Sequence, residues 1–320
     1  MQKTLFLLAV LSTSFFTIQA QKSEKEILKN LEQKSEDYGN IAQNIWEFAE
    51  MGYQEEQSSG LLQKTLQDAG FTIKKGVAGI PTAFIAEYGS GSPVIAIMGE
   101  FDALPGLSQK ATAEKESAGK AAGHACGHHL FGTASTAAAI STKEWLEANK
   151  SKGTIRFYGT PAEEGGSGKV YMVREGLFND VDIALHWHPG DENEANAGAA
   201  LANKSAKFRF YGISAHAAGS PEKGRSALDG VEAMDMMVNM MREHIPQEAR
   251  IHYVITDGGK APNVVPDFAE VYYYARHNKR DVVIDIFDRM VKAAEGAALG
   301  TGTTMDYEMI GGTHELLPNL

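Results

Sequence analysis

The 320-residue sequence has a single cysteine, Cys126, so no disulfide can form within the chain. Basic residues are also few: 30 Lys and Arg stand against 41 Asp and Glu, which gives a net charge of −11. An acidic chain repels phosphate, which argues against nucleic acids and anionic membrane surfaces as partners. The sequence has no internal repeat or low-complexity tract. Its composition, 43% apolar and 22% charged, is that of an ordinary globular protein.

Long apolar runs are confined to the N-terminus. Residues 5–16 are mostly apolar, Lys3 precedes them, and Ala20 is a small residue at a cleavage point. This pattern predicts a secretory signal peptide over residues 1–20, and the run is short for the alternative, an uncleaved membrane anchor. No later segment reaches the ~18 apolar residues that a spanning helix needs. We therefore expect a periplasmic or secreted protein with no membrane attachment after signal cleavage.

The first half of the chain alternates between helical and strand-like patterns. Helical patterns cover 23–50, 58–69, 131–146 and 170–175, and strand-like patterns cover 71–73, 82–88, 93–98, 154–158 and 182–187. This alternation predicts an α/β domain over residues 21–195, in which helices flank a mostly parallel sheet.

The pattern changes after residue 195. The order becomes strand, helix, strand, strand, helix, strand, at 206–211, 226–243, 250–256, 269–276, 282–298 and 303–309. This βαββαβ order predicts a ferredoxin-like domain over residues 196–310. Its first helix carries a stripe rich in methionine. Such a stripe usually packs in a core, and the alternative is a surface for a partner.

Half of the ten histidines fall within residues 124–188, together with the only cysteine. Crowded imidazole, thiol and carboxylate groups form the donor set of a transition-metal site. In HACGHH (124–129), Cys126 and His128 are two residues apart, so a turning backbone can aim both at one point. The helix that follows would favour a thiolate at Cys126. A buried structural cysteine beside ordinary histidines is the alternative.

Two adjacent carboxylates, Glu163 and Glu164, lie in TPAEEGG (160–166), directly after the predicted strand 154–158. Sites of α/β sheets lie at this edge. Neighbouring carboxylates on a loop point in different directions, so one can bind a cation while the other transfers protons. The alternative is an acidic turn exposed to solvent.

Two further segments also follow predicted strands. His186 and His188 of HWHP face the same side of a strand, so either can be a metal ligand and the other can support it. Asp102 of GEFDALP can orient a ligating imidazole, or it can cap the turn that follows.

Six segments in order resemble the M20 family of metallopeptidases and amidohydrolases, and in particular its aminobenzoyl-glutamate hydrolase branch. They are GEFDALPG (99–106), HACGHH (124–129), TPAEEGGSG (160–168), DIALHWHPG (182–190), AHAAGSPEKGRSALDG (215–230) and NVVPDFAEVYYYAR (263–276). The resemblance implies a metal-dependent hydrolase that cleaves the amide bond of N-acyl or aminobenzoyl amino acids or small peptides with a metal-activated water. It also implies two divalent metal ions, Zn or Mn, and an inserted lid domain through which the chain forms a homodimer.

The resemblance also implies roles for individual residues. Four would be metal ligands: Cys126, His128, Glu164 and His188. His188 is favoured over His186 because it stands six residues after Asp182 in its motif. Glu163 would be the general base, and Asp102 would be a supporting carboxylate. In the lid, His216 would reach a partner subunit's active site and stabilise the oxyanion. Asn263 and Arg276 would hold the carboxylate or carbonyl of the substrate.

The resemblance ends early. Family members return to the catalytic domain after the lid and bring a further histidine ligand there. Here residues 311–320 would only begin that segment, so we expect a truncated chain with weak metal binding and low turnover. Two other functions stay open: a catalytically inactive binding or dimerisation module, and a metal-dependent esterase or deacetylase with the same centre.

Overall fold

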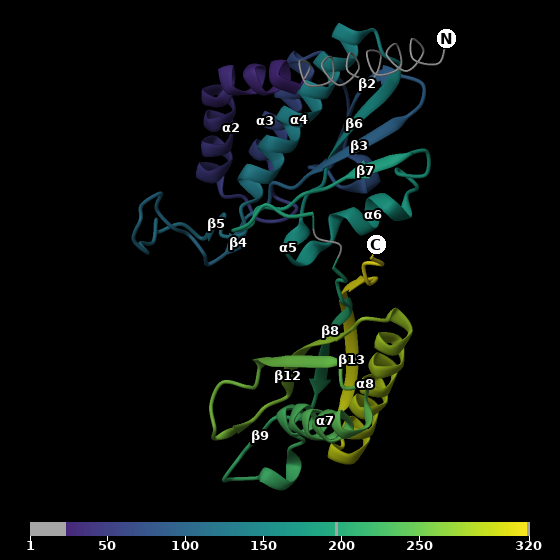
Figure 1. Cartoon of the computed structure of the whole chain (residues 1–320). Helices are drawn as coiled ribbons and strands as arrows, with labels where there is room; N and C mark the ends of the chain where they lie inside the picture. Colours follow the sequence, from purple (N-terminus) through teal and green to yellow (C-terminus); the bar gives the residue numbers. More distant parts are fainter. Residues whose placement is uncertain (1–23, 196–197, 319–320) are drawn as a thin grey trace, which may run out of the picture. The chain divides into compact units, whose positions relative to one another are not determined.

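The computed structural model describes residues 24–195 and 198–318, and the predicted signal peptide, residues 1–20, lies outside this range. The chain divides into two compact units (Figure 1), one up to Glu192 and one from Asn193 on. In the part of the chain that is described, no helix combines the length and the hydropathy needed to cross a bilayer.

The first unit contains a five-stranded sheet with the order β1-β2-β6-β3-β7. Its strands are β1 (Thr72–Lys75), β2 (Phe84–Ser90), β3 (Val94–Gly99), β6 (Gly153–Gly159) and β7 (Ile183–Leu185). β3 is parallel to both β6 and β7, whereas β2 is antiparallel to β1 and β6. The sheet is therefore mixed. The parallel half follows from the predicted α/β pattern, and the antiparallel half follows from the short link between β1 and β2.

The first unit also contains a helical segment at 24–33, α2 (Ser35–Phe48), α3 (Glu56–Asp68), α4 (His128–Asn149), α5 (Glu163–Gly166) and α6 (Gly168–Arg174). Helices pack on both faces of the sheet. α2, α3 and α4 pack against one another on one side of the strands (Figure 1). Phe84 and Phe157 are buried on that face, while the neighbouring Ile85 and Tyr158 face the other way, toward Met172 of α6. This alternation along β2 and β6 is the two-residue period of a strand buried on both faces.

The arrangement of β3, β6 and β7 brings three loops together. The strands are parallel, so their carboxyl ends share one edge of the sheet. Residues 100–103, 160–167 and 186–189 follow these ends, and residues 124–127 precede α4. The short strands β4 (Leu104–Pro105) and β5 (Ala122–Gly123) pair with each other beside this edge and close the loop between them.

The second unit contains a four-stranded antiparallel sheet with the order β10-β12-β8-β13. Its main elements are β8 (Ala202–Tyr211), α7 (Ala227–Met241), β10 (Arg250–Asp257), β12 (Phe268–His277), α8 (Arg280–Thr301) and β13 (Thr304–Thr313). α7 and α8 pack on one face, where Phe208, Val271 and Phe287 are buried. β13 continues three residues beyond residue 310, where the sequence predicts that this domain ends. β9 (Ala215–His216) and β11 (Val264–Val265) form a separate two-stranded ladder.

The methionine stripe of α7 has two environments. Met234 and Met241 are buried in the core of the second unit, so core packing explains them. Met236, Met237 and Met240 are 61%, 41% and 62% exposed, so core packing does not explain these three.

A buried carboxyl group also lies in this core. Asp235 of α7 is 6% exposed and accepts a hydrogen bond from the Tyr273 hydroxyl. Burial raises the pKa of Asp235 from 3.8 to about 6, although the Tyr273 bond opposes the shift. Because this pKa is higher in the folded chain, the group contributes stability at low pH. That contribution is lost as pH rises through about 6.

The substitution Asp235→Asn should therefore stabilise the second unit at pH 7.5 by about 3 kcal/mol, since one pKa unit is worth ~1.4 kcal/mol. The asparagine oxygen can still accept the Tyr273 hydrogen bond, and at pH 4 the gain should nearly vanish. Urea unfolding at both pH values measures the difference, with exposed Asp288→Asn on α8 as the matched control. An Asn variant that is less stable than the parent at pH 7.5 contradicts this account.

Candidate metal centre

His128, the first residue of α4, is fully buried between two carboxylates. Its Nδ1 lies 2.9 Å from Asp102 Oδ1 and 3.1 Å from the Asp102 carbonyl oxygen. Its Nε2 lies 3.0 Å from Glu100 Oε2, but these two atoms are not in hydrogen-bonding geometry. Burial would lower the pKa of His128, yet Asp102 and Glu100 together raise it to about 10. The surroundings of this ring therefore favour a positive charge.

Asp102 also connects two of the loops. It is 1% exposed, and its second oxygen, Oδ2, accepts a hydrogen bond of 2.8 Å from the Glu164 amide. One carboxylate thus orients the His128 ring and fixes the backbone of the Glu163–Glu164 turn.

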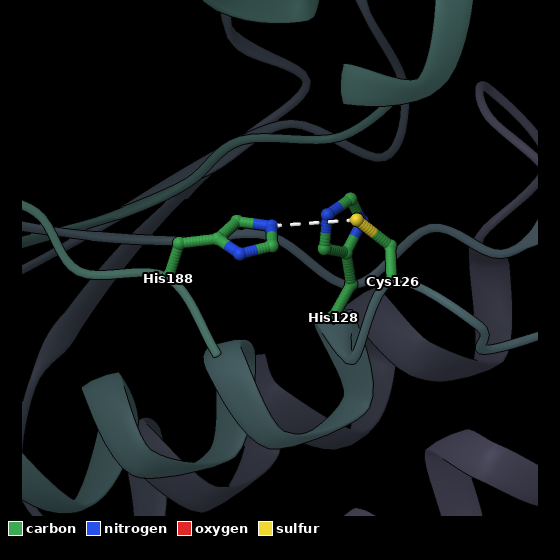
Figure 2. A group of neighbouring side chains, drawn as sticks. All are labelled: Cys126, His128 and His188. Atoms are coloured by element: carbon green, nitrogen blue, oxygen red, sulfur yellow. Dashed lines mark hydrogen bonds between the residues drawn. The ribbon is translucent and has the colours of Figure 1, made fainter. Parts of the chain in front are cut away.

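Cys126 lies opposite His188. Its Sγ is 3.4 Å from His188 Nε2, and His128 lies beside them (Figure 2). One donor atom from each of these three residues lies within 4.8 Å of the others. Gly127 makes this approach possible: its φ is +85°, and a Cβ there would lie 2.9 Å from Pro189 Cβ. Any side chain at residue 127 would both strain the backbone and push the two loops apart.

The thiol of Cys126 is held in its protonated form. Burial raises its pKa, and the carboxylates of Glu164, Glu163 and Glu100 add to this, so that the pKa reaches about 12. The expectation of a thiolate stabilised by the α4 dipole is therefore wrong for these surroundings, because burial and negative charge outweigh the dipole. A bound divalent cation would supply the positive charge that a thiolate needs here.

Glu163 and Glu164 follow a strained residue, because Ala162, directly before them, has a φ of +55°. Burial raises the pKa of Glu163, and the charges of Glu100 and Glu164 raise it further. Carboxylate atoms of Glu163 and Glu100 and a His128 nitrogen lie within 4.8 Å of one another. Glu164 Oε1 is buried and has no hydrogen-bond partner among the described residues.

Sequence reasoning missed two groups that shape this turn and its neighbour. Glu55 is fully buried, and its carboxylate accepts hydrogen bonds from the Ala162 amide (2.8 Å) and the Thr82 hydroxyl (3.0 Å). Nothing in its local sequence signals this role, because both partners are distant along the chain. Glu100 lies two residues before Asp102, inside a motif already identified, and that proximity was the available signal.

Glu100 is 2% exposed and surrounded by positive or ionisable groups. Its Oε1 accepts a hydrogen bond from Lys169 Nζ and lies 3.5 Å from His186 Nε2. Burial alone would raise the pKa of Glu100, but His128, His186 and Lys169 lower it well below its usual range. His186 thus faces Glu100, whereas His188 faces Cys126.

Two other histidines of the cluster are packing residues. The His124 and His129 rings lie 5.2 Å apart, and His129 also contacts Trp46. His124 Nε2 is 3.0 Å from the carbonyl oxygen of Ile45. Burial lowers the pKa of both histidines to about 4, so both are neutral.

The remaining predicted site residues belong to the second unit. His216 and Asn263 are adjacent, since the Ala217 amide bonds to the Asn263 carbonyl. Arg276 instead lies at the other end of β12, eight residues beyond Phe268, which is on the order of 26 Å along a strand. There its guanidinium lies 5.1 Å from the centre of the Tyr274 ring. The three residues therefore do not form one cluster within this unit, although two of them come from one sequence segment.

The donor set of the first unit fits divalent cations. It combines thiol, imidazole and carboxylate groups, which is the ligand chemistry of zinc and related metals. Three buried atoms, Glu100 Oε2, His128 Nε2 and Glu164 Oε1, have no hydrogen-bond partner among the described residues. Buried polar atoms are rarely left unpaired, so these atoms indicate a positively charged partner.

Comparison with known proteins agrees with this reading. The chain is 50% identical over 289 residues to one of the subunits of the p-aminobenzoyl-glutamate hydrolase of Escherichia coli (strain K12), a match that covers 88% of this chain and 59% of that protein. The chain thus spans about three-fifths of the length of that relative.

Two solved structures share the fold. An aminobenzoyl-glutamate utilization protein from Klebsiella pneumoniae has a TM-score of 0.69 at 20% identity, covering 92% of this chain and 80% of that one. A dinuclear metal-binding M20 peptidase from Bacillus subtilis has a TM-score of 0.58 at 22% identity, covering 87% and 75%.

The sequence profile of Peptidase family M20/M25/M40 matches residues 96–316, which is more than half of the chain and includes every segment that carries the site. The resemblance predicted from the motifs is confirmed, and the chain belongs to the M20/M25/M40 peptidase family.

Proposed function

We propose that this chain is a metal-dependent hydrolase that cleaves the amide bond of N-acyl or aminobenzoyl amino acids. The proposal rests on one observation: donor atoms of Cys126, His128 and His188 lie within 4.8 Å of one another. Glu163, whose pKa burial raises, lies close to His128. Family membership supports the reaction class, and the name of the E. coli relative supports p-aminobenzoyl-glutamate as a substrate. The chain spans 59% of that relative. We therefore include in the proposal that this chain hydrolyses the substrate as a separate polypeptide.

The proposed cofactors are two divalent cations, Zn or Mn. Their ligands would be drawn from four residues: Cys126, His128, His188 and Glu164. The unpaired buried atoms and the dinuclear B. subtilis neighbour support this number and class. Bound cations would polarise the amide carbonyl and lower the pKa of an attacking water.

The chain's own residues supply the proton transfers. A Glu163 carboxylate oxygen takes a proton from the attacking water and returns it to the leaving amine, and its raised pKa suits both steps. Asp102 keeps the His128 ring in one orientation and fixes the amide of Glu164 at the same time. Loss of Asp102 would therefore disturb two of the proposed ligands at once.

We propose that the second unit is a ferredoxin-like lid through which the chain forms a homodimer. The strand order β13-β8-β12-β10, with both helices on one face, supports the fold, and the exposed methionines of α7 offer an apolar surface. His216 Nδ1 accepts hydrogen bonds from the amides of Ala218 and Gly219. Its neutral ring then carries a proton on Nε2, as an oxyanion donor requires. Periplasmic or secreted localisation rests on residues 1–20 alone.

Removal of the proposed base should abolish hydrolysis without loss of the cations. In Glu163→Gln, the rate of p-aminobenzoate release from p-aminobenzoyl-glutamate should fall by roughly 10²–10⁴-fold, because the neutral amide cannot accept a proton. Cation content by mass spectrometry should stay near that of the parent. Glu114→Gln, in an exposed loop, is the matched control. A parent chain that binds cations but releases no product would favour the inactive binding module instead.

Cations should also stabilise the first unit. With free zinc at 100 times its dissociation constant, the free energy of unfolding should rise by about 2.7 kcal/mol. Cys126→Ser should lose most of this increase because a hydroxyl is a poor zinc ligand. Its stability without metal should change little, which serves as the internal control. Thermal unfolding with and without chelator measures the effect, and equal metal-induced stabilisation of both proteins would exclude Cys126 as a ligand.

A further inference from the structure

Glu100 is a buried carboxylate to which the proposed function gives no role. It directly follows β3 and shares the strand-end edge with the proposed ligands. Its Oε1 is engaged by Lys169 and His186, whereas its Oε2 faces His128 and has no hydrogen-bond partner among the described residues. A buried carboxylate with one oxygen in hydrogen bonds and the other without such a partner can bind a cation through the second oxygen.

Oε2 of Glu100 faces Nε2 of His128 at 3.0 Å, a distance at which the charged ring and the carboxylate form an ion pair. The contact lacks hydrogen-bonding geometry, and both atoms are buried. The Nδ1 atom of the ring faces the carboxylate and the carbonyl of Asp102, so Nε2 is the nitrogen that can bind a cation. A cation bound to both Nε2 and Oε2 would take the place of the second ring proton.

Two groups of donor atoms share His128. The first group is Cys126, His128 and His188, and the second is Glu100, His128 and Glu163. Since Asp102 occupies Nδ1, both groups depend on Nε2 of His128, and one imidazole nitrogen binds one cation.

We propose that Glu100 is a further ligand of the cation bound by His128, and that Lys169 is the residue that positions it. This inference rests on the proposed metal-dependent function. Cys126, His128, His188 and Glu100 would together give a four-donor set of one sulfur, two nitrogens and one oxygen, which suits zinc.

Lys169 reaches Glu100 because of how α6 begins. Gly168 starts this helix so close to the preceding loop that a Cβ there would lie 2.1 Å from the Pro161 carbonyl oxygen. The close start places Lys169 beside Glu100, where its ammonium binds Oε1. This contact fixes the carboxylate with Oε2 toward His128 and offsets part of the negative charge of the site.

Cobalt(II) tests the proposal because its visible spectrum reports on the ligands directly. The parent chain should bind Co²⁺ with a sulfur-to-metal charge-transfer band from Cys126 and with ligand-field bands from the whole set. Glu100→Gln should weaken Co²⁺ binding on the order of 10–100-fold and change the ligand-field bands, while the charge-transfer band at saturation remains. Glu175→Gln, at the exposed end of α6, should bind like the parent.

Two variants of Lys169 test whether this residue positions Glu100 through its charge or only supports the fold. Lys169→Met should weaken Co²⁺ binding less than Glu100→Gln does, and Lys169→Arg should restore it. If Glu100→Gln does not fold, as judged by circular dichroism, Glu100→Asp keeps the charge but shortens the side chain and should still alter the ligand-field bands. If Glu100→Gln binds Co²⁺ with the affinity and the spectrum of the parent, Glu100 is not a ligand, and the proposed hydrolase function is unaffected. Absence of Co²⁺ binding in the parent overturns the proposed function as well.

Discussion

The site depends on the buried contact between Asp102 and His128. A single carboxylate accepts from the imidazole with one oxygen and from the Glu164 amide with the other, and so joins the ends of β3 and β6 to the start of α4. Because Asp102 is 1% exposed, the contact is strong enough to fix both partners. The same contact decides which ring nitrogen of His128 faces the carboxylates and thiol around it.

Local backbone strain keeps these groups in place. Ala162 adopts a left-handed conformation that costs on the order of 1 kcal/mol, and Glu55 stabilises it by accepting a hydrogen bond from its amide. Gly127 adopts a similar conformation where the Cys126 loop touches Pro189. In the glutamate loop the strained residues are Ala162 and Ser167, which flank the pair, whereas Gly127 adopts its conformation at no steric cost. The sheet and helices behind them are regular, which is how a rigid scaffold holds a precise site.

The strands and the edge of the sheet that carries the site could be predicted from the sequence. Strand periodicity is visible in short segments, and parallel strands place the segments that follow them at one edge. The buried run before Gly99 predicts β3, and parallel strands bring the segments after β3, β6 and β7 to one edge. The remainder depends on contacts between distant residues. Glu55 and Lys169 act on partners 107 and 69 positions away, and no local pattern encodes such pairs. Arg276 and Asn263 share a sequence segment, but Asn263 precedes β11 and Arg276 lies near the far end of β12. The thiolate prediction failed because it counted a helix dipole and not the surrounding carboxylates.

The raised pKa of Cys126 has a consequence for the reactivity of its sulfur while no cation is bound. Peroxides and mixed disulfides attack the thiolate, and a thiol with a pKa of about 12 is almost entirely protonated at neutral pH. The acidic neighbours of Cys126 thus also protect the sulfur from oxidation in the cation-free chain. In the proposed site, the negative field that would attract a cation also keeps Cys126, its proposed sulfur ligand, protonated until that cation binds.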